Sequence, residues 1–84
     1  MNEQGIEKRL RDVIREVARQ DVGVTDLDAD LVRELGLDSL AALRVLAAVE
    51  KRFDIHFPDE RLAEYRTLRQ LRDFITQAEA GRMP

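Results

Sequence analysis

Residues 35–53, which read LGLDSLAALRVLAAVEKRF, are the most informative stretch of this 84-residue sequence. From Leu40 to Phe53, ten of the fourteen residues are apolar, and at helical spacing they surround the helix axis instead of lining one face. A helix with this pattern either lies in the centre of a core or presents part of its surface to a partner. We therefore expect a helix over residues 40–53 in one of these two settings.

A second helical pattern precedes this stretch. Its apolar residues recur at helical spacing and form one stripe that we expect to be buried: Ile6, Leu10, Val13, Ile14 and Val17. Asn2 is a suitable N-cap for this helix, and Gly23 is a suitable residue to end it. The pattern predicts a long helix with one face in the core.

A third helical pattern lies near the carboxyl end. Its apolar stripe consists of Leu68, Leu71, Ile75 and Ala78. Thr67 and Gln70 have the spacing of a capping box at its start, and Gly81 follows it. Between the second and third long helices, residues 59–64 leave room for a short helix just after Pro58.

The connector of residues 20–38 is long for a domain of this size. Such loops are usually functional or are held down by their own apolar residues. Here those residues are Val22, Val24, Leu27, Leu31, Leu35 and Leu37, and residues 31–35 suit a short helical turn. We expect the connector to cross the bundle so that the helices on either side of it run in the same direction.

The fold class expected is therefore all-α: a four-helix bundle of three long helices and one short one, with a long loop after the first. Residues 1–84 form one small domain, too small for a large internal active site. Neither a bilayer-spanning apolar run nor the apolar stretch of a signal peptide is present, which favours a cytoplasmic protein. Cysteine is absent, so disulfides and thiolate metal sites are excluded.

Acidic charge is concentrated in the connector. Residues 20–38 contain six acidic residues against Arg33 alone, while the net charge of the whole chain is −3. A nucleic-acid-binding domain of this size is more often strongly basic, so we do not expect nucleic acid as a partner.

Ser39 is the residue best placed for chemistry. At the first turn of a helix, unpaired backbone N–H groups and the positive end of the helix dipole favour an attached anion such as a phosphate. The alternative is that Asp38 or Ser39 merely caps the helix, because Ser and Asp are preferred at N-caps. These residues alone leave both interpretations open.

The stretch Leu35-Gly36-Leu37-Asp38-Ser39-Leu40 resembles the phosphopantetheine attachment motif of acyl carrier proteins. The resemblance extends from the first helix to Ile75. Its other matching positions are Asp30-Leu31, Glu50, Phe53, Phe57-Pro58-Asp59-Glu60 and Thr67-Leu68.

This resemblance implies that a phosphopantetheinyl transferase attaches 4′-phosphopantetheine from coenzyme A to Ser39. The thiol of the arm would then hold acyl or aminoacyl groups as thioesters, and the chain itself would be a carrier without catalytic residues. Asp38 would serve capping or transferase recognition, and Leu40 would be the apolar contact beside the arm. In this family the cargo can fold back between helices; the corresponding residues are Leu43, Leu46, Phe57, Leu62 and Leu68, which we attribute to ordinary core packing.

The second long helix departs from the pattern of fatty-acid-synthesis carriers, which tend to expose acidic residues there. This chain has Arg44, Lys51 and Arg52, with Glu50 as the sole acid. We therefore expect a stand-alone monomeric carrier in a specialised pathway, recognised partly through Arg44. Its expected partners are an acyl- or aminoacyl-loading ligase and ketosynthase, transferase or condensation-type enzymes.

The competing hypothesis is a small helical interaction or nucleic-acid-binding module. Two rows of arginines at helical spacing could follow phosphates, although we expect solvated faces: Arg11, Arg15 and Arg19, and Arg66, Arg69 and Arg72. Asp26, Asp28 and Asp30 resemble the start of a calcium loop, but Leu31 and Leu37 stand where that loop needs Gly and Glu, so a solvated acidic loop is expected. His56 is the only histidine, and we assign it neither a metal nor a catalytic role.

Overall fold

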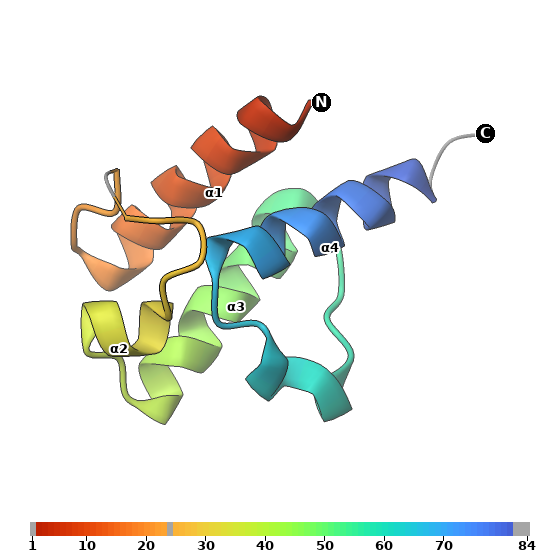
Figure 1. Cartoon of the computed structure of the whole chain (residues 1–84). Coiled ribbons are helices and arrows are strands. Elements are labelled where there is room, and N and C mark those ends of the chain that lie inside the picture. Colours follow the sequence, from red (N-terminus) through yellow and green to blue (C-terminus); the bar gives the residue numbers. More distant parts are fainter. Residues whose placement is uncertain (1, 24, 82–84) are drawn as a thin grey trace.

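The computed structural model describes residues 2–23 and 25–81. Figure 1 shows the order of the helices: α1 (Glu3–Ala18), α2 (Leu31–Leu35), α3 (Ser39–Phe53), the 3-10 helix η1 (Asp59–Glu64) and α4 (Leu68–Ala80). No strand occurs in the described residues, which confirms the all-α fold class. Within the same residues, no helix is both long and apolar enough to cross a membrane.

Helix α1 packs against both α3 and α4. Figure 1 shows α1 running antiparallel to α3, whereas α4 runs in the direction of α3. Arg9, in the middle of α1, accordingly lies over the ring of Phe53 at the end of α3, 5.4 Å from the ring centroid. The expectation that α1 and α3 run in the same direction is therefore wrong. The connector has a different role, because it contacts the start of α4 before it turns back to α3.

The ends of α1 explain its length. The Asn2 side chain accepts a hydrogen bond of 2.7 Å from the Gly5 N–H, as expected of an N-cap. The helix ends at Arg19, which adopts a left-handed conformation (φ 56°), so the expectation that Gly23 ends it is wrong. Val17 is 36% exposed, and the buried stripe is limited to Ile6, Leu10, Val13 and Ile14.

The start of α4 matches its sequence signature. The Thr67 hydroxyl accepts a hydrogen bond from the Gln70 N–H, and the Gln70 side chain accepts one from the Thr67 N–H. This reciprocal capping box confirms where α4 begins, and Gly81 is its C-cap. The short helix expected after Pro58 is present as a 3-10 helix.

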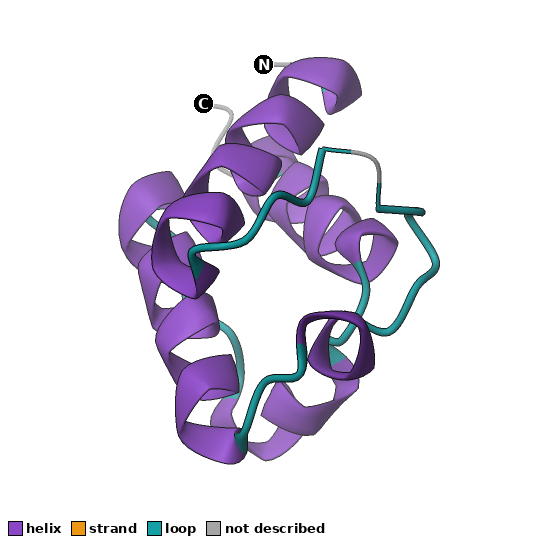
Figure 2. Cartoon of the chain, turned by 90° about the vertical axis from the view of Figure 1, so that its left-hand side faces the viewer, coloured by secondary structure: helices purple, strands orange, loops and turns teal. Residues whose placement is uncertain are grey.

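The connector is held down by apolar residues and by one partly buried cation. Val22, Leu31 and Leu35 are buried, and the short helix α2 forms as expected; Val24 lies outside the described residues. The Arg11 guanidinium donates to the carbonyls of Val22 (2.6 Å) and Thr25 (2.9 Å). Arg11 therefore anchors the connector, and the solvated role expected for it is wrong. Figure 2 faces the side of the bundle on which this connector lies.

One hydrophobic core joins all these elements. Its fully buried side chains include Phe57, Leu10, Ile14, Leu68 and Leu71, and Leu46 is 7% exposed, as its expected core position requires. Phe57 also contacts the rings of Tyr65 and Phe74, with centroids 4.9 and 4.8 Å away. This core fixes α3 and the segment around η1 on two sides of the region described next.

Candidate functional site

Ser39 is the first residue of α3, and its side chain is exposed. The N-cap is Asp38, whose carboxylate accepts a hydrogen bond of 2.7 Å from the Ala41 N–H. The Ser39 hydroxyl forms no hydrogen bond with any described residue. Asp38 therefore fulfils the capping role, and the hydroxyl remains available for another one.

Gly36 brings Ser39 to this position. It is the C-cap of α2 with φ of 63°, a left-handed conformation that glycine adopts without the steric cost of a Cβ. Only Leu37 and Asp38 separate it from α3. Because the first N–H groups of a helix lack partners within the helix, the start of α3 presents positive partial charge beside Ser39.

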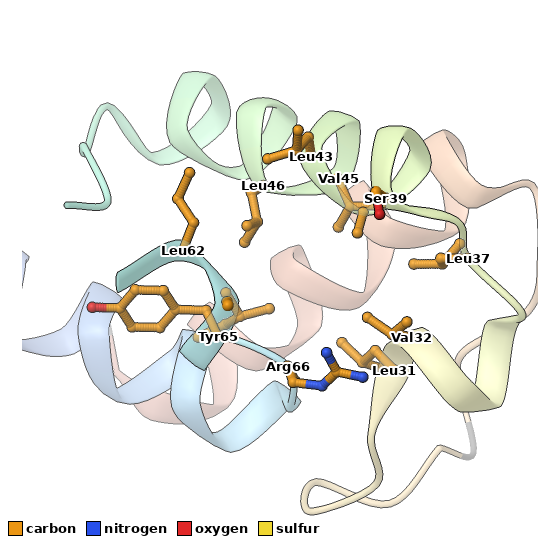
Figure 3. Close-up of a pocket in the computed structure, with 13 residues that line it drawn as sticks. Leu31, Val32, Leu37, Ser39, Leu43, Val45, Leu46, Leu62, Tyr65 and Arg66 are labelled. Atoms are coloured by element: carbon orange, nitrogen blue, oxygen red, sulfur yellow. The ribbon is translucent and has the colours of Figure 1, made fainter. Parts of the chain in front are cut away.

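A largely apolar cavity of about 300 Å³ lies beside Ser39, between α3 and the segment around η1 (Figure 3). Its lining includes Leu31, Val32, Leu37, Ser39, Val45, Leu46, Leu43, Leu62, Tyr65 and Arg66. Ser39 lies at one end of the α3 wall in Figure 3. An apolar chain entering this space would be shielded from water on several sides.

The structure separates the five residues that the family resemblance connects with cargo. Leu43, Leu46 and Leu62 line the cavity, whereas Phe57 and Leu68 are fully buried and are not part of its lining. Leu43 is 48% exposed, so the attribution of all five to core packing is wrong for this residue. Leu40 is 58% exposed and lies outside the cavity lining.

Arg44 also lies on the exposed part of α3, and it forms no ion pair with a described residue. It follows Leu43 directly and Leu40 by about one helical turn. Arg52, by contrast, is paired with Glu16 of α1, with 3.1 Å between Nη2 and Oε2. The start of α3 therefore exposes two leucines and one unpaired cation near Ser39.

Acidic residues of the connector pair with arginines at the start of α4. Arg66 Nη2 lies 2.9 Å from Asp30, and Arg69 Nε lies 2.7 Å from Asp28. The hydrogen bonds from these arginines are the main reason that the pKa values of Asp30 and Asp28 lie below the usual value for aspartate. Both pairs lie at the exposed surface, as expected of solvated groups, and the structure adds that the two groups are partners of each other.

Arg66 and Tyr65 line the cavity, a position that sequence reasoning missed, since the sequence presents Arg66 only as part of an arginine row. Asp30 and Arg66 are 36 residues apart. Periodicity and local motifs cannot predict a pairing over that separation, so the Asp30–Arg66 pair is visible only in the structure.

His56 pairs with Glu50, with 3.0 Å between Nδ1 and Oε2. The same carboxylate oxygen accepts a hydrogen bond of 2.7 Å from the Phe57 N–H. Glu50 thus fixes the chain that leaves α3 and brings Phe57 into the core.

Residues 8–75 match the protein family described as "Phosphopantetheine attachment site". The chain belongs to this family. It is 35% identical over 81 residues to the acyl carrier protein of Guillardia theta, covering 96% of this chain and all of the relative. It is 41% identical over 70 residues to the anthracycline acyl carrier protein DauA of Streptomyces sp. (strain C5) and to its counterpart DpsG of Streptomyces peucetius; each alignment covers 76% of this chain and 83% of the relative.

Membership makes this chain a phosphopantetheine carrier with a covalently bound 4′-phosphopantetheine. The residues present fit that group: the start of α3 offers a free hydroxyl and unpaired N–H groups, and the cavity beside it is apolar enough for an acyl chain. When bound, the group supplies a thiol that forms thioesters. Such proteins interact with a phosphopantetheinyl transferase and with biosynthetic enzymes.

Proposed function

We propose that Ser39 is the residue that carries the arm. The observation that supports this most directly is that Asp38 caps α3 while the exposed Ser39 hydroxyl borders the cavity without a hydrogen-bond partner among the described residues. Ser39 is also the only serine in the sequence. The positive end of α3 would stabilise the phosphate charge next to it.

The chain's own residues would hold the arm and shield its cargo without catalysing the transfer. A serine hydroxyl needs a base to become a nucleophile. The nearest carboxylate in the sequence, Asp38, accepts the Ala41 N–H through Oδ1 and serves as the cap of α3. The transferase would therefore provide the base and the metal ion, and Asp38 would contribute the cap and a recognition contact.

The exposed start of α3 would be the recognition surface, with Leu40 and Arg44 as contacts. The two relatives named as anthracycline carriers support a role in polyketide-type biosynthesis, with a loading ligase and ketosynthase, transferase or condensation-type enzymes as partners. The proposal includes a monomer in the cytoplasm, where the reducing environment keeps the thiol of the arm free.

The nucleic-acid-binding alternative is disfavoured by the pairing within the arginine row of residues 66–72. Arg66 and Arg69 are paired with Asp30 and Asp28, and Arg72 lies 3.7 Å from Glu7. Their charge is already partly balanced within the protein, so they form a poor surface for phosphates.

Intact mass after incubation with coenzyme A and a broad-specificity phosphopantetheinyl transferase tests the assignment. The wild-type chain should gain one arm, and Ser39→Ala should gain none while folding normally. Thr25→Ala is the control, because it removes a hydroxyl from the connector and should load like the wild type. Loading of Ser39→Ala would disprove the site, and a folded wild-type chain that stays unmodified would contradict the assignment.

A further inference from the structure

Arg66 is the single charged side chain that lines the cavity in the described part of the chain. It lies between η1 and α4, on the wall opposite α3 (Figure 3). In that view its guanidinium group points toward Leu31 and Val32, at the end of the cavity where Ser39 also lies. A positive group therefore borders an otherwise apolar space.

Both the backbone and the side chain of Arg66 are held in place. Its N–H donates a hydrogen bond of 2.8 Å to Gln70 Oε1, and its carbonyl accepts one of 2.8 Å from the Leu31 N–H. Its Nε and Nη2 both lie close to Asp30 Oδ2, at 3.0 and 2.9 Å. The other oxygen of Asp30 caps α2 by accepting from the N–H groups of Val32 and Arg33, so the partner of Arg66 is also fixed.

One part of this guanidinium group is unused. Nε donates to Asp30 Oδ2, Nη2 is ion-paired with the same oxygen, and Nη1 forms no hydrogen bond with any described residue. An arginine keeps its charge and has five N–H donors in a fixed plane. Donors held in position bind an acceptor without a further ordering cost, and a hydrogen bond from a charged donor is stronger than a neutral one.

We propose that Arg66 selects cargo that carries a carbonyl oxygen close to its thioester, such as a 3-oxoacyl chain, over a saturated chain of equal length. The inference rests on the proposed function of Ser39, because the cargo reaches the cavity only on an arm attached there. A saturated chain fills the apolar space but offers no acceptor to Nη1. A 3-oxoacyl chain offers a carbonyl oxygen while its remaining carbons contact Leu46 and Leu62.

The phosphate of the arm is the other possible acceptor, and the location of Arg66 disfavours it. The phosphate would be attached to Ser39 at the start of α3, where the N–H groups of that helix are available. Arg66 belongs to the wall that faces α3 across the apolar space (Figure 3).

The test uses full-length protein that the transferase has loaded with amide-linked octanoyl or 3-oxooctanoyl arms. Intact mass first confirms loading, so a failure of the proposed function is seen before the cargo is examined. The NMR shift of the carbon-13-labelled 3-carbonyl is then compared with that of the same arm free in solution. Wild-type protein should shift this signal, and Arg66→Met and Arg66→Gln should both lose the shift.

Arg69→Met is the matched control, because Arg69 also pairs with a connector aspartate but does not line the cavity. It should keep the wild-type carbonyl shift. The octanoyl arm should perturb the methyl signals of Leu46 and Leu62 equally in wild type and in both Arg66 variants. A carbonyl shift that survives in folded Arg66 variants, or that Arg69→Met also removes, would overturn the proposal. The proposal would also be overturned if attaching the arm without cargo shifted the NMR signal of Arg66 Nε as much as attaching the arm with the 3-oxooctanoyl group.

Discussion

Arg69 and Asp28 are joined by two hydrogen bonds, from Nε to Oδ1 at 2.7 Å and from Nη2 to Oδ2 at 3.2 Å, although 41 residues separate them. Next to this pair, the Arg69 N–H donates to the Leu27 carbonyl at 3.0 Å. Two residues further along the connector, Asp30 pairs with Arg66 through one carboxylate oxygen. These contacts hold the connector against the start of α4.

The first prediction concerns acid stability. Because the pKa values of Asp28 and Asp30 are lowered in the folded protein, their contribution to stability is present above the unfolded aspartate pKa of about 3.9 and is lost as pH falls through the lower folded values. Arg69→Met removes the main cause of the Asp28 shift. We expect the thermal midpoint of this variant, followed by circular dichroism, to depend less steeply on pH below about pH 4.

Arg44→Met is the control for this experiment, since Arg44 forms no ion pair with a described residue. It should keep the wild-type dependence on pH. If Arg69→Met and wild type lose stability in parallel over the acid range, the Asp28–Arg69 pair does not influence the pKa of Asp28 in solution.

The Asp28–Arg69 and Asp30–Arg66 pairs also show which contacts cannot be predicted from the sequence. Helix caps at Asn2 and Thr67 could be predicted because each depends on residues three positions away. The end of α1 could not, because Arg19 takes the left-handed conformation in which Gly would be favoured. Asp28 and Arg69 each look like ordinary surface residues in their own segments, and their pairing depends on how the connector folds.

In the candidate site, too, some residues could be predicted from local motifs and others only from the structure. Asp38 and Ser39 are adjacent, so the motif predicts them together, and only the structure decides which one caps the helix. Leu62 and Arg66 also line the cavity, although they are far from Ser39 in the sequence. Their role depends on how the segment around η1 is placed opposite α3, which no local pattern encodes.

The second prediction separates the two roles of Asp38. Asp38→Ala removes the cap of α3 and should lower the free energy of unfolding by about 1 kcal/mol. Asp38→Asn keeps an oxygen that can accept from the Ala41 N–H, so it should leave stability close to wild type. Both variants should load more slowly with the transferase if the carboxylate is a recognition contact. Normal loading of Asp38→Asn would show that Asp38 serves only as the cap.

The third prediction compares two leucines that line the cavity. Leu46 is 7% exposed, and Leu46→Ala should lower the free energy of unfolding by about 2 to 4 kcal/mol through lost burial and an enlarged cavity. Leu43 is 48% exposed, and Leu43→Ala should cost less than about 1 kcal/mol. Urea unfolding measures both. Equal losses in the two variants would mean that Leu43 is packed as tightly as Leu46 in solution.

The last prediction concerns the sign of the charge at the start of α3. Arg44 lies on the same exposed surface as Leu40 and Leu43, so a partner that docks beside Ser39 would meet a cation there. Like charges across an interface slow encounter, and salt weakens the effect. In the loaded carrier, Arg44→Glu should therefore improve turnover by a fatty-acid-synthesis ketosynthase and impair turnover by the cognate partner.

Lys8→Glu controls for net charge, because it makes the same change on an exposed position of α1. It should affect neither enzyme by more than about twofold, and rising salt should reduce the Arg44→Glu effects while leaving Lys8→Glu unchanged. If Arg44→Glu also stays within about twofold of wild type for both enzymes at low salt, the cation does not take part in partner selection. Recognition would then depend on Leu40 and Leu43, whose exposed apolar area makes no distinction between acidic and basic partners.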